Sequence, residues 1–230
     1  LLLLGLISQA QTGLYNSGNL QVHEGGQIGF HTNLINDGVF DQNAGLVGFY
    51  GTSAITISGA FMSVFYDTEI ANERGVTLQT PVSVVNNANF VVGNVITPRD
   101  LSATYFNFLK DAFDVGASDG SYVEGYAAIT EQKNFTFPVG DDGQLRPLIL
   151  NSTAVNPMAK CAYFFDNPSH PIPFPENFNT NIKVRDIGPV SETEFWRLEG
   201  SVTSTVTISW NERSNLSALT DDPNSIIVVG

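Results

Sequence analysis

Residues 33–49 read NLINDGVFDQNAGLVGF, and this stretch decides the fold. Short apolar runs alternate with corners of Asn, Asp and Gly, which is the pattern of short strands joined by tight turns. Asn and Gly tolerate the left-handed backbone that such corners often need. The stretch therefore predicts brief strands that change direction every few residues.

The same pattern extends in both directions, from Leu14 to Thr97. This region has no lysine and only one arginine, Arg74, whereas helices usually carry many charges. The larger pattern repeats about every 20 residues, which lies in the range of solenoid repeats. We therefore expect residues 13–97 to form about four coils of a parallel β-solenoid, within a solenoid region that spans residues 11–116. An antiparallel sandwich is the alternative that the same short strands permit.

Longer apolar runs mark the second half of the chain, after a turn cluster at residues 116–120. Their number and spacing predict an Ig-like antiparallel β-sandwich over residues 117–230. The chain ends in an apolar run, so we expect this domain to be truncated and more protein to follow. The expected strands are residues 122–129, 134–139, 145–150, 159–165, 182–185, 195–199, 202–210 and 226–229.

Three segments of this part of the sequence carry more specific expectations. Residues 101–115 fit a helix or a strand, and their aromatic content favours a strand. The alternating run 202–210 places Val206, Ile208 and Trp210 on the face that points into the core. The proline-rich residues 167–179 cannot form a central strand and are expected to be a surface loop.

The first ten residues, LLLLGLISQA, are typical of a secretory signal that is removed on export. Cleavage after Ala10 would leave Gln11 as the new N-terminus; a buried apolar strand is the alternative. The run is shorter than the roughly 20 apolar residues of a membrane span, and no later stretch reaches that length. We therefore expect a secreted or cell-surface protein without a membrane span.

Charge and cysteine content narrow the classes of partner and site. The 230 residues include 10 Lys and Arg against 23 Asp and Glu, a net charge of -13. Nucleic acids and anionic membranes need a basic face, so neither is expected as a partner. The single cysteine, Cys161, excludes an internal disulfide framework and is expected to be a small core residue.

Several strings resemble a known family of proteins. Residues 134–143, NFTFPVGDDG, followed by LRPL at 145–148, resemble the "FTFPVG…RPL" block of large secreted surface proteins of gliding Bacteroidota. Residues 118–125, SDGSYVEG, are similar to the segment that precedes this block in those proteins. Residues 191–196 and 204–210 resemble the strands that follow it, and residues 75–82 look like their solenoid coils.

This resemblance covers essentially the whole chain and implies a role at the cell surface. Proteins of this kind usually end in a sorting domain read by the type IX secretion system, and many are associated with gliding motility. The sequence here does not include that sorting domain, so this secretion route is implied by the resemblance alone. The resemblance supplies no catalytic residues.

The sequence contains no motif that predicts catalysis, a cofactor or a metal. The three histidines, His23, His31 and His170, are scattered and are expected to be surface residues. Arg74 and Arg99 alone would not form the cationic groove that a polysaccharide lyase needs. Between residues 14 and 97 the acids show no repeated spacing that would stack a catalytic pair; these acids are Glu24, Asp37, Asp41, Asp67, Glu69 and Glu73.

Two other features of the sequence resemble binding sites. The acidic turns at residues 141–143 and 221–224 offer oxygens that calcium prefers, but they lack calcium-loop spacing and are expected to be plain turns. The aromatic residues around the proline-rich segment could form a sugar- or partner-binding patch. A loop folded back onto the domain is the preferred interpretation for these residues, which are Phe164, Phe165, Phe174 and Phe178.

Together these observations favour a non-enzymatic secreted cell-surface protein that acts as a structural stalk or adhesion segment. Its expected partners are the secretion machinery and an unknown surface or glycan ligand, with no cofactor. A carbohydrate-binding module is the first alternative, and it would present a row of exposed aromatic side chains. A β-helical polysaccharide-degrading enzyme is the second, and it would present clustered carboxylates in a cleft.

Overall fold

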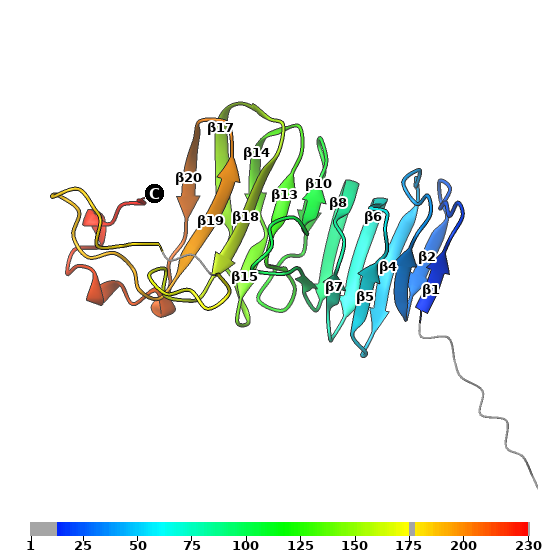
Figure 1. The fold of residues 1–230 in the computed structure, drawn as a ribbon, viewed down its shortest axis with the longest axis horizontal. Helices are drawn as coiled ribbons and strands as arrows, with labels where there is room; N and C mark the ends of the chain where they lie inside the picture. Colours follow the sequence, from blue (N-terminus) through cyan, green and yellow to red (C-terminus); the bar gives the residue numbers. More distant parts are fainter. Residues whose placement is uncertain (1–12, 175–177, 230) are drawn as a thin grey trace, which may run out of the picture.

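The protein is all-β and winds into a β-solenoid of about six turns. The structure, a computed structural model, describes residues 13–174 and 178–229. In Figure 1 the coils stack along the horizontal axis, from β1 at the right to the C-terminal strands at the left. The prediction of a parallel β-solenoid is therefore confirmed.

Two long sheets form the walls of the solenoid, and a small sheet lies at its C-terminal end. The first sheet contains, in order, β1 (Gly13–Asn16), β3 (Asn33–Asn36), β5 (Ile55–Ser58), β7 (Val76–Leu78), β9 (Val95–Ile96), β12 (Val123–Glu124), β15 (Val139–Asp141) and β16 (Gln144–Leu145). The second contains β2 (Gln27–Phe30), β4 (Leu46–Gly51), β6 (Ser63–Asn72), β8 (Val82–Val92), β10 (Phe106–Phe108), β13 (Ala127–Ile129), β18 (Ala159–Phe164) and β19 (Phe195–Gly200), with β11 (Phe113–Val115) beside β8. The third contains β14 (Gln132–Phe137), β17 (Leu148–Asn156) and β20 (Ser204–Ile208). Short 3-10 helices follow at η1 (Glu212–Ser214), η2 (Leu216–Ala218) and η3 (Pro223–Ser225).

Polar side chains at the corners hold successive coils in register. Asn16 at the end of β1 lies opposite Asn36 at the end of β3. The Asn16 amide donates to the Asn36 side-chain oxygen at 2.8 Å, across 20 residues of sequence, and the Asn36 amide donates to Ser63 Oγ at 3.1 Å. All three side chains are buried, so each hydrogen bond also satisfies a polar group that water cannot reach. The predicted repeat of about 20 residues is thus confirmed at the level of individual contacts.

Apolar side chains from successive coils stack in the interior. The rings of Phe30 and Phe49 lie parallel at a centroid distance of 5.3 Å, and Phe40 meets Phe65 edge-on at 5.4 Å. All four rings are almost fully buried. Each contributes about 1.5–3 kcal/mol through burial, so every coil is stabilised mainly by its two neighbours.

Glycine is required at two corners where the backbone of one coil touches the next. Gly93 has φ +80°, and a Cβ there would lie 1.7 Å from the carbonyl oxygen of Asn72. Gly59 has φ +119°, with a Cβ position 2.2 Å from the Asn36 carbonyl oxygen. Neither position has room for a side chain, which explains why Asn and Gly recur together in this sequence.

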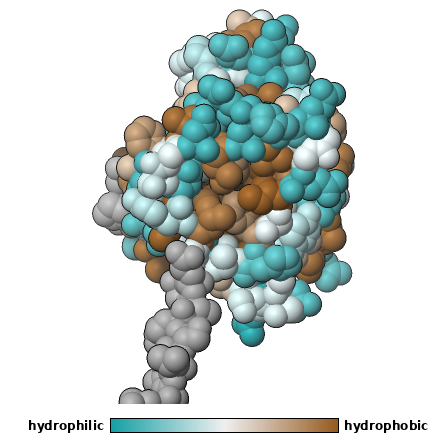
Figure 2. All heavy atoms as spheres, turned by 90° about the vertical axis from the view of Figure 1, so that its right-hand side faces the viewer, coloured by the Kyte–Doolittle hydropathy of each residue, from teal (hydrophilic) through white to brown (hydrophobic). Residues whose placement is uncertain are grey.

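The N-terminal end of the solenoid shows its interior. Figure 2 looks onto the end that carries β1, where apolar side chains fill the centre and hydrophilic side chains form much of the rim. Leu14, Leu20 and Ile28 belong to this end and pack against the buried core while remaining partly exposed. The same apolar column therefore continues through every coil.

Parallel pairing continues well into the second half of the chain. It runs past residue 116, because β12 pairs in parallel with β9 and β13 pairs in parallel with β10. Antiparallel pairing joins β13 to β18, β14 to β17 and β15 to β16. An Ig-like sandwich over residues 117–230, whose strands would all pair antiparallel, is not confirmed.

The individual strand expectations for this half have mixed outcomes. Strands lie where residues 159–165, 195–199 and 202–210 predicted them, although the last is limited to Ser204–Ile208. Residues 122–129 form two strands because the chain bends at Gly125, which has φ +116°. The segment 101–115 contains the two short strands β10 and β11. Residues 182–185 and 226–229 form no strand.

Trp210 does not face the core, which corrects the expectation from the alternating run. Strand β20 ends at Ile208, and the side chain of Trp210 is 53% exposed. Val206 and Ile208 do pack against the core, as expected. The alternation was therefore interpreted correctly, but it does not extend past the strand.

A buried polar cluster closes the C-terminal end of the solenoid. Arg146 is 2% exposed and bonds both carboxylate oxygens of Glu194 at 2.8 Å. Tyr163 donates its hydroxyl proton to Glu194 at 2.6 Å, Trp196 donates to the Arg146 carbonyl oxygen, and Ser214 Oγ accepts from Arg146. Burial and this bond to a carboxylate raise the pKa of Tyr163. We call these five residues the end cluster.

Four further expectations concern Cys161, the proline-rich segment, the first ten residues and membrane spans. Cys161 is fully buried, as predicted, and burial raises the pKa of its thiol. The described part of the proline-rich segment forms turns and loop rather than strand. The signal sequence predicted for residues 1–10 lies outside the described residues. No helix in the described part of the chain has the length and hydrophobicity needed to cross a bilayer.

Candidate functional site

The second sheet forks at β8, and the fork leaves a groove in the wall. The first half of β8 pairs with β10, and its second half pairs with β11. The sheet continues from β10 to β13, whereas β14 leaves it to pair with β17. Among the described residues, β11 pairs only with β8 and β14 only with β17, so each strand has one free edge. A groove of about 480 Å³ is lined by residues of both strands.

Asp114 in β11 brings a carboxylate to an interior position of the fork. It lies opposite Ala88 of β8, which in turn lies opposite Thr68 of β6. Thr68 lies opposite Val47 of β4, and all three of these side chains are buried. Asp114 therefore continues a row of side chains on neighbouring strands that face inward. The other members of the row, Val47, Thr68 and Ala88, are small or apolar.

The surroundings of Asp114 favour its neutral form. Desolvation by burial is the main cause, and it raises the pKa of the carboxyl to about 6 from an ordinary 3.8. A hydrogen bond from its own backbone opposes the shift. The structure places no arginine or lysine on the groove wall, so no cation from the described residues lining it compensates the charge.

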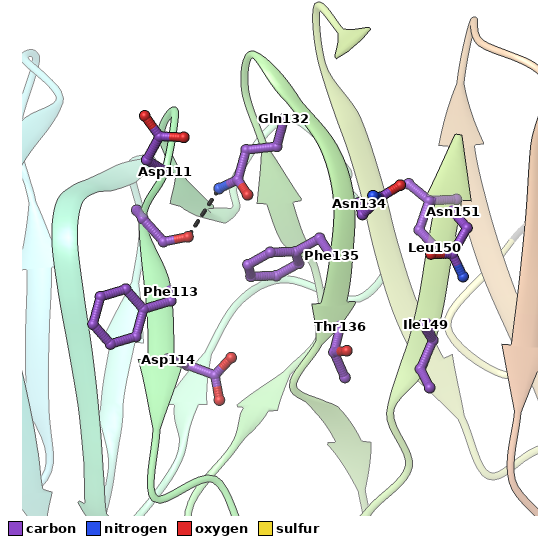
Figure 3. Close-up of a pocket in the computed structure, with 11 residues that line it drawn as sticks. Asp111, Phe113, Asp114, Gln132, Asn134, Phe135, Thr136, Ile149, Leu150 and Asn151 are labelled. Atoms are coloured by element: carbon purple, nitrogen blue, oxygen red, sulfur yellow. Dashed lines mark hydrogen bonds between the residues drawn. The ribbon is translucent and has the colours of Figure 1, made fainter. Parts of the chain in front are cut away.

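The opposite wall is aromatic and amide-rich. Figure 3 shows Asp114 pointing from β11 toward β14, while the Phe135 ring points from β14 back toward β11. Phe135 packs on Phe108 at a centroid distance of 4.8 Å, and this contact holds the Phe135 ring at the floor of the groove. The remaining wall carries hydrogen-bonding and aliphatic side chains from β14 and β17, which are Asn134, Thr136, Ile149 and Asn151.

Gln132 closes one end of the groove. Its side-chain amide nitrogen lies within hydrogen-bond distance of three backbone carbonyl oxygens, those of Phe108, Leu109 and Ala112, at 2.8–3.3 Å. One of these bonds is drawn in Figure 3. The amide thus ties the start of β14 to the turn before β11, and the groove lies below it. This single side chain links the two strands at one end of the groove.

The residues singled out in the sequence do not gather at this groove. His23, His31 and His170 are exposed on separate segments, and His31 lies against Tyr50 at a centroid distance of 5.7 Å. Arg74 lines a second hollow with Glu73 and Glu124. No group of metal-ligating side chains large enough to hold an ion was found among residues 13–174 and 178–229.

The acidic turns have partners within the chain. Arg99 bonds Asp141 at 2.6 Å, and Arg213 bonds Asp142 at 2.6 Å. The later turn uses Asp222 to accept the backbone N–H of Asn224 at the start of η3. Both segments are therefore turns, as the sequence favoured.

The aromatic loop folds back onto the solenoid end. Phe164 and Phe174 are buried and meet edge-on at 4.9 Å, and Phe164 stacks on Phe195 at 4.9 Å. Arg99 lies over the Phe164 ring at 4.6 Å. Arg213 lies over the Phe165 ring at 3.6 Å, and Phe178 lies against Phe195 at 5.4 Å, with Phe165 and Phe178 partly exposed. The preferred interpretation, a folded-back loop, is confirmed for these described residues.

Two acids that the sequence does not link, Asp67 and Glu69, lie side by side on β6. Asp67 and Glu69 alternate with the buried Thr68, so both lie on the outer face of β6. Each carboxylate accepts a hydrogen bond from a side-chain amide of β8. Asn86 donates to Asp67 and Asn89 donates to Glu69, both at 2.7 Å. Spacing of two residues on one strand was the available signal. Their oxygens serve as acceptors in a polar surface network.

The groove itself left only a weak signal in the sequence. Nothing local distinguishes Asp114 from the other acids, because its interior position depends on register with β8. Gln132 and Phe135 lie on a strand that the sequence assigned to a sandwich. Comparison with family models, with curated proteins and with solved structures gave no match.

Proposed function

We propose that this protein is a non-enzymatic, secreted cell-surface protein whose solenoid serves as a stalk or adhesion segment. The observation that carries the proposal is the uninterrupted stacking of about six coils, closed at one end by the end cluster. A chain of mutually buried coils makes a stiff rod of defined length. The net charge of -13 would keep such rods soluble and apart.

Secretion is part of the same proposal. It is supported by the apolar run at residues 1–7 with Ser8-Gln9-Ala10 after it, and by a single cysteine. The resemblance to surface proteins of gliding Bacteroidota supports export through the type IX system and a link to gliding motility. Mass spectrometry of protein secreted from a host carrying the complete precursor should find Gln11 at the N-terminus. Mature protein that keeps Leu1 would contradict this.

A polysaccharide-degrading enzyme is the alternative that an assay separates most directly. The purified protein should release neither reducing ends nor unsaturated sugars from a panel of acidic and neutral polysaccharides. Turnover that disappears in Asp67→Asn or Glu69→Gln would overturn the scaffold role, because these two acids share one outer face. Asp41→Asn, in an exposed loop, is the control with the same loss of charge.

A carbohydrate-binding module would need a row of exposed aromatic rings. Tyr15 and Phe113 are exposed and lie on strands, but their register neighbours are Ile35 and Asn87. Tyr66 is exposed on β6, and four more rings are exposed outside the strands, those of Phe61, Phe165, Phe178 and Trp210. The exposed rings thus occupy separate elements, which supports a stalk over a flat sugar-binding platform.

A further inference from the structure

The groove between β11 and β14 combines features that single out one class of ligand. It is bordered by two strand edges that have no strand partner among the described residues. Its floor is an aromatic ring, and its wall carries a carboxylate without a cationic partner among the lining residues. We propose that this groove binds an extended polypeptide segment of a partner protein, and that a lysine or arginine of the segment pairs with Asp114.

The free edges support a peptide as the occupant. A strand edge offers backbone N–H and C=O groups at a spacing that only another extended chain matches along its length. Here β11 and β14 both border the groove, so a segment lying in it has a backbone partner within reach of either edge. Neither edge carries a proline in β11 or β14 that would remove a donor.

The side chains specify what such a segment should carry. Asp114 points into the groove from an otherwise small and apolar row, and its charge has no compensating cation on the wall. The aliphatic part of a lysine or arginine would pack on Phe135, while its charged end would meet the carboxylate. The amides of Asn134 and Asn151 lie on the far wall and offer donors and acceptors to the rest of the segment.

The charge of the whole chain favours the same partner. With a net charge of -13, the protein attracts cationic segments and repels acidic ones over a distance of about 10 Å at moderate salt. Asp111 also lines the groove and is exposed in the turn before β11. A basic segment is therefore drawn toward this part of the wall before it inserts.

This inference deepens the adhesion part of the proposed function and rests on it, because it gives the stalk a class of ligand. The scaffold role and the peptide ligand are tested by different assays. Loss of peptide binding would leave the rod and its lack of turnover unaltered, whereas polysaccharide turnover would overturn the scaffold role whether or not peptides bind.

The test uses fluorescein-labelled hexapeptides of sequence Thr-Val-Lys-Val-Thr-Val, with Glu or norleucine in place of Lys as matched probes. Fluorescence anisotropy with the full chain should show binding of the Lys peptide. Asp114→Asn should weaken it about tenfold or more, as expected for loss of a charge-assisted contact. Asp41→Asn removes the same charge from an exposed loop and should change the affinity less than about twofold.

Cross-linking then locates the peptide. A Thr136→Cys variant should form a disulfide with a peptide carrying an activated thiol, faster than Leu101→Cys, whose exposed site lies outside the groove. Cys161 is buried and should not compete. The proposal is overturned if no peptide binds up to millimolar concentration, if the Glu peptide binds as well as the Lys peptide, or if Asp114→Asn leaves affinity unaltered. Selective binding of glycans, or of a second copy of the chain, in the groove would overturn it too.

Discussion

The N-terminal coils and the C-terminal end of the same solenoid are held together by different kinds of contact. In the coils, residues about 20 positions apart meet repeatedly, so that Asn16 bonds Asn36 and Phe30 stacks on Phe49. At the end cluster, one buried ion pair joins residues 48 positions apart, Arg146 and Glu194. The coils spread their stability over many similar contacts, whereas the end depends on a few contacts that have no copies.

Breaking the end cluster should have the largest effect. Glu194→Ala leaves the Arg146 charge buried without its partner, which should lower the free energy of unfolding by about 3–5 kcal/mol. Asp142→Asn is the control, because the Asp142 side chain is largely exposed and exposed ion pairs contribute only about 0–1 kcal/mol. Urea unfolding of both variants measures the difference. Equal losses of unfolding free energy in the two variants would show that the buried ion pair contributes no more than an exposed one.

Adding a side chain at a corner should have a smaller but local effect. Gly59→Ala forces a non-glycine residue into φ +119° against the Asn36 carbonyl and should cost about 1–3 kcal/mol. Hydrogen exchange should show the loss of protection in β3 and β5, with the end cluster unaffected. Gly143→Ala, at φ +75° with open space around it, separates backbone strain from the clash. Loss of protection spread evenly along the rod would contradict coil-by-coil stacking.

Asp114→Asn should stabilise the protein at neutral pH. The folded-state pKa, about 6, lies above the ordinary value, so the folded protein binds a proton more tightly than the unfolded chain. Stability should therefore rise as pH falls from about 7 toward 4 through this group, and be lowest above pH 6. The variant should lose this part of the pH dependence, and at pH 7.5 its free energy of unfolding should be higher than that of the unchanged protein. A less stable variant at that pH would show that the carboxylate has a partner in the fold.

Trp210→Ala should have the smallest effect. The side chain is 53% exposed beyond the end of β20, so the free energy of unfolding should change by about 0.5 kcal/mol or less. Ile208→Ala is the matched comparison, because it packs against the core on the same segment and should cost more. Denaturant unfolding of Trp210→Ala and Ile208→Ala measures the two losses of free energy, and the comparison shows where the core ends. A loss of several kcal/mol for Trp210→Ala would move that boundary.

The difference between the two regions also explains what the sequence could predict. The coils repeat a local code of Asn and Gly corners, and residues such as Asn36 and Gly59 favoured a parallel solenoid of about 20 residues per coil over the sandwich that the same strands permit. The second half keeps this spacing only as far as β13, where Phe106 lies opposite Ala127, and its later strands pair antiparallel. Alternation in residues 122–129 and 134–139 fits a coil and a sandwich equally well, because both bury one face of a strand.

The contacts that decide the candidate site are the least visible in the sequence. The inward position of Asp114 follows from its register with Ala88, and Gln132 acts through carbonyl groups about 20 residues away. The partners Arg146 and Glu194 have no motif that links them. Such contacts depend on where the chain returns in space, which local propensity does not encode.

The separation of 48 residues between Arg146 and Glu194 has a mechanical consequence. Pulled from its two ends, a coil that unravels releases about 20 residues, or roughly 70 Å of extended chain. Rupture of the ion pair, once β17 and β18 also separate from their neighbouring strands, would release the enclosed segment, on the order of 160 Å when extended. A force–extension trace should therefore show a series of short steps and one that is about twice as long, so that the tethered rod yields gradually under load along the coils and abruptly at its closed end.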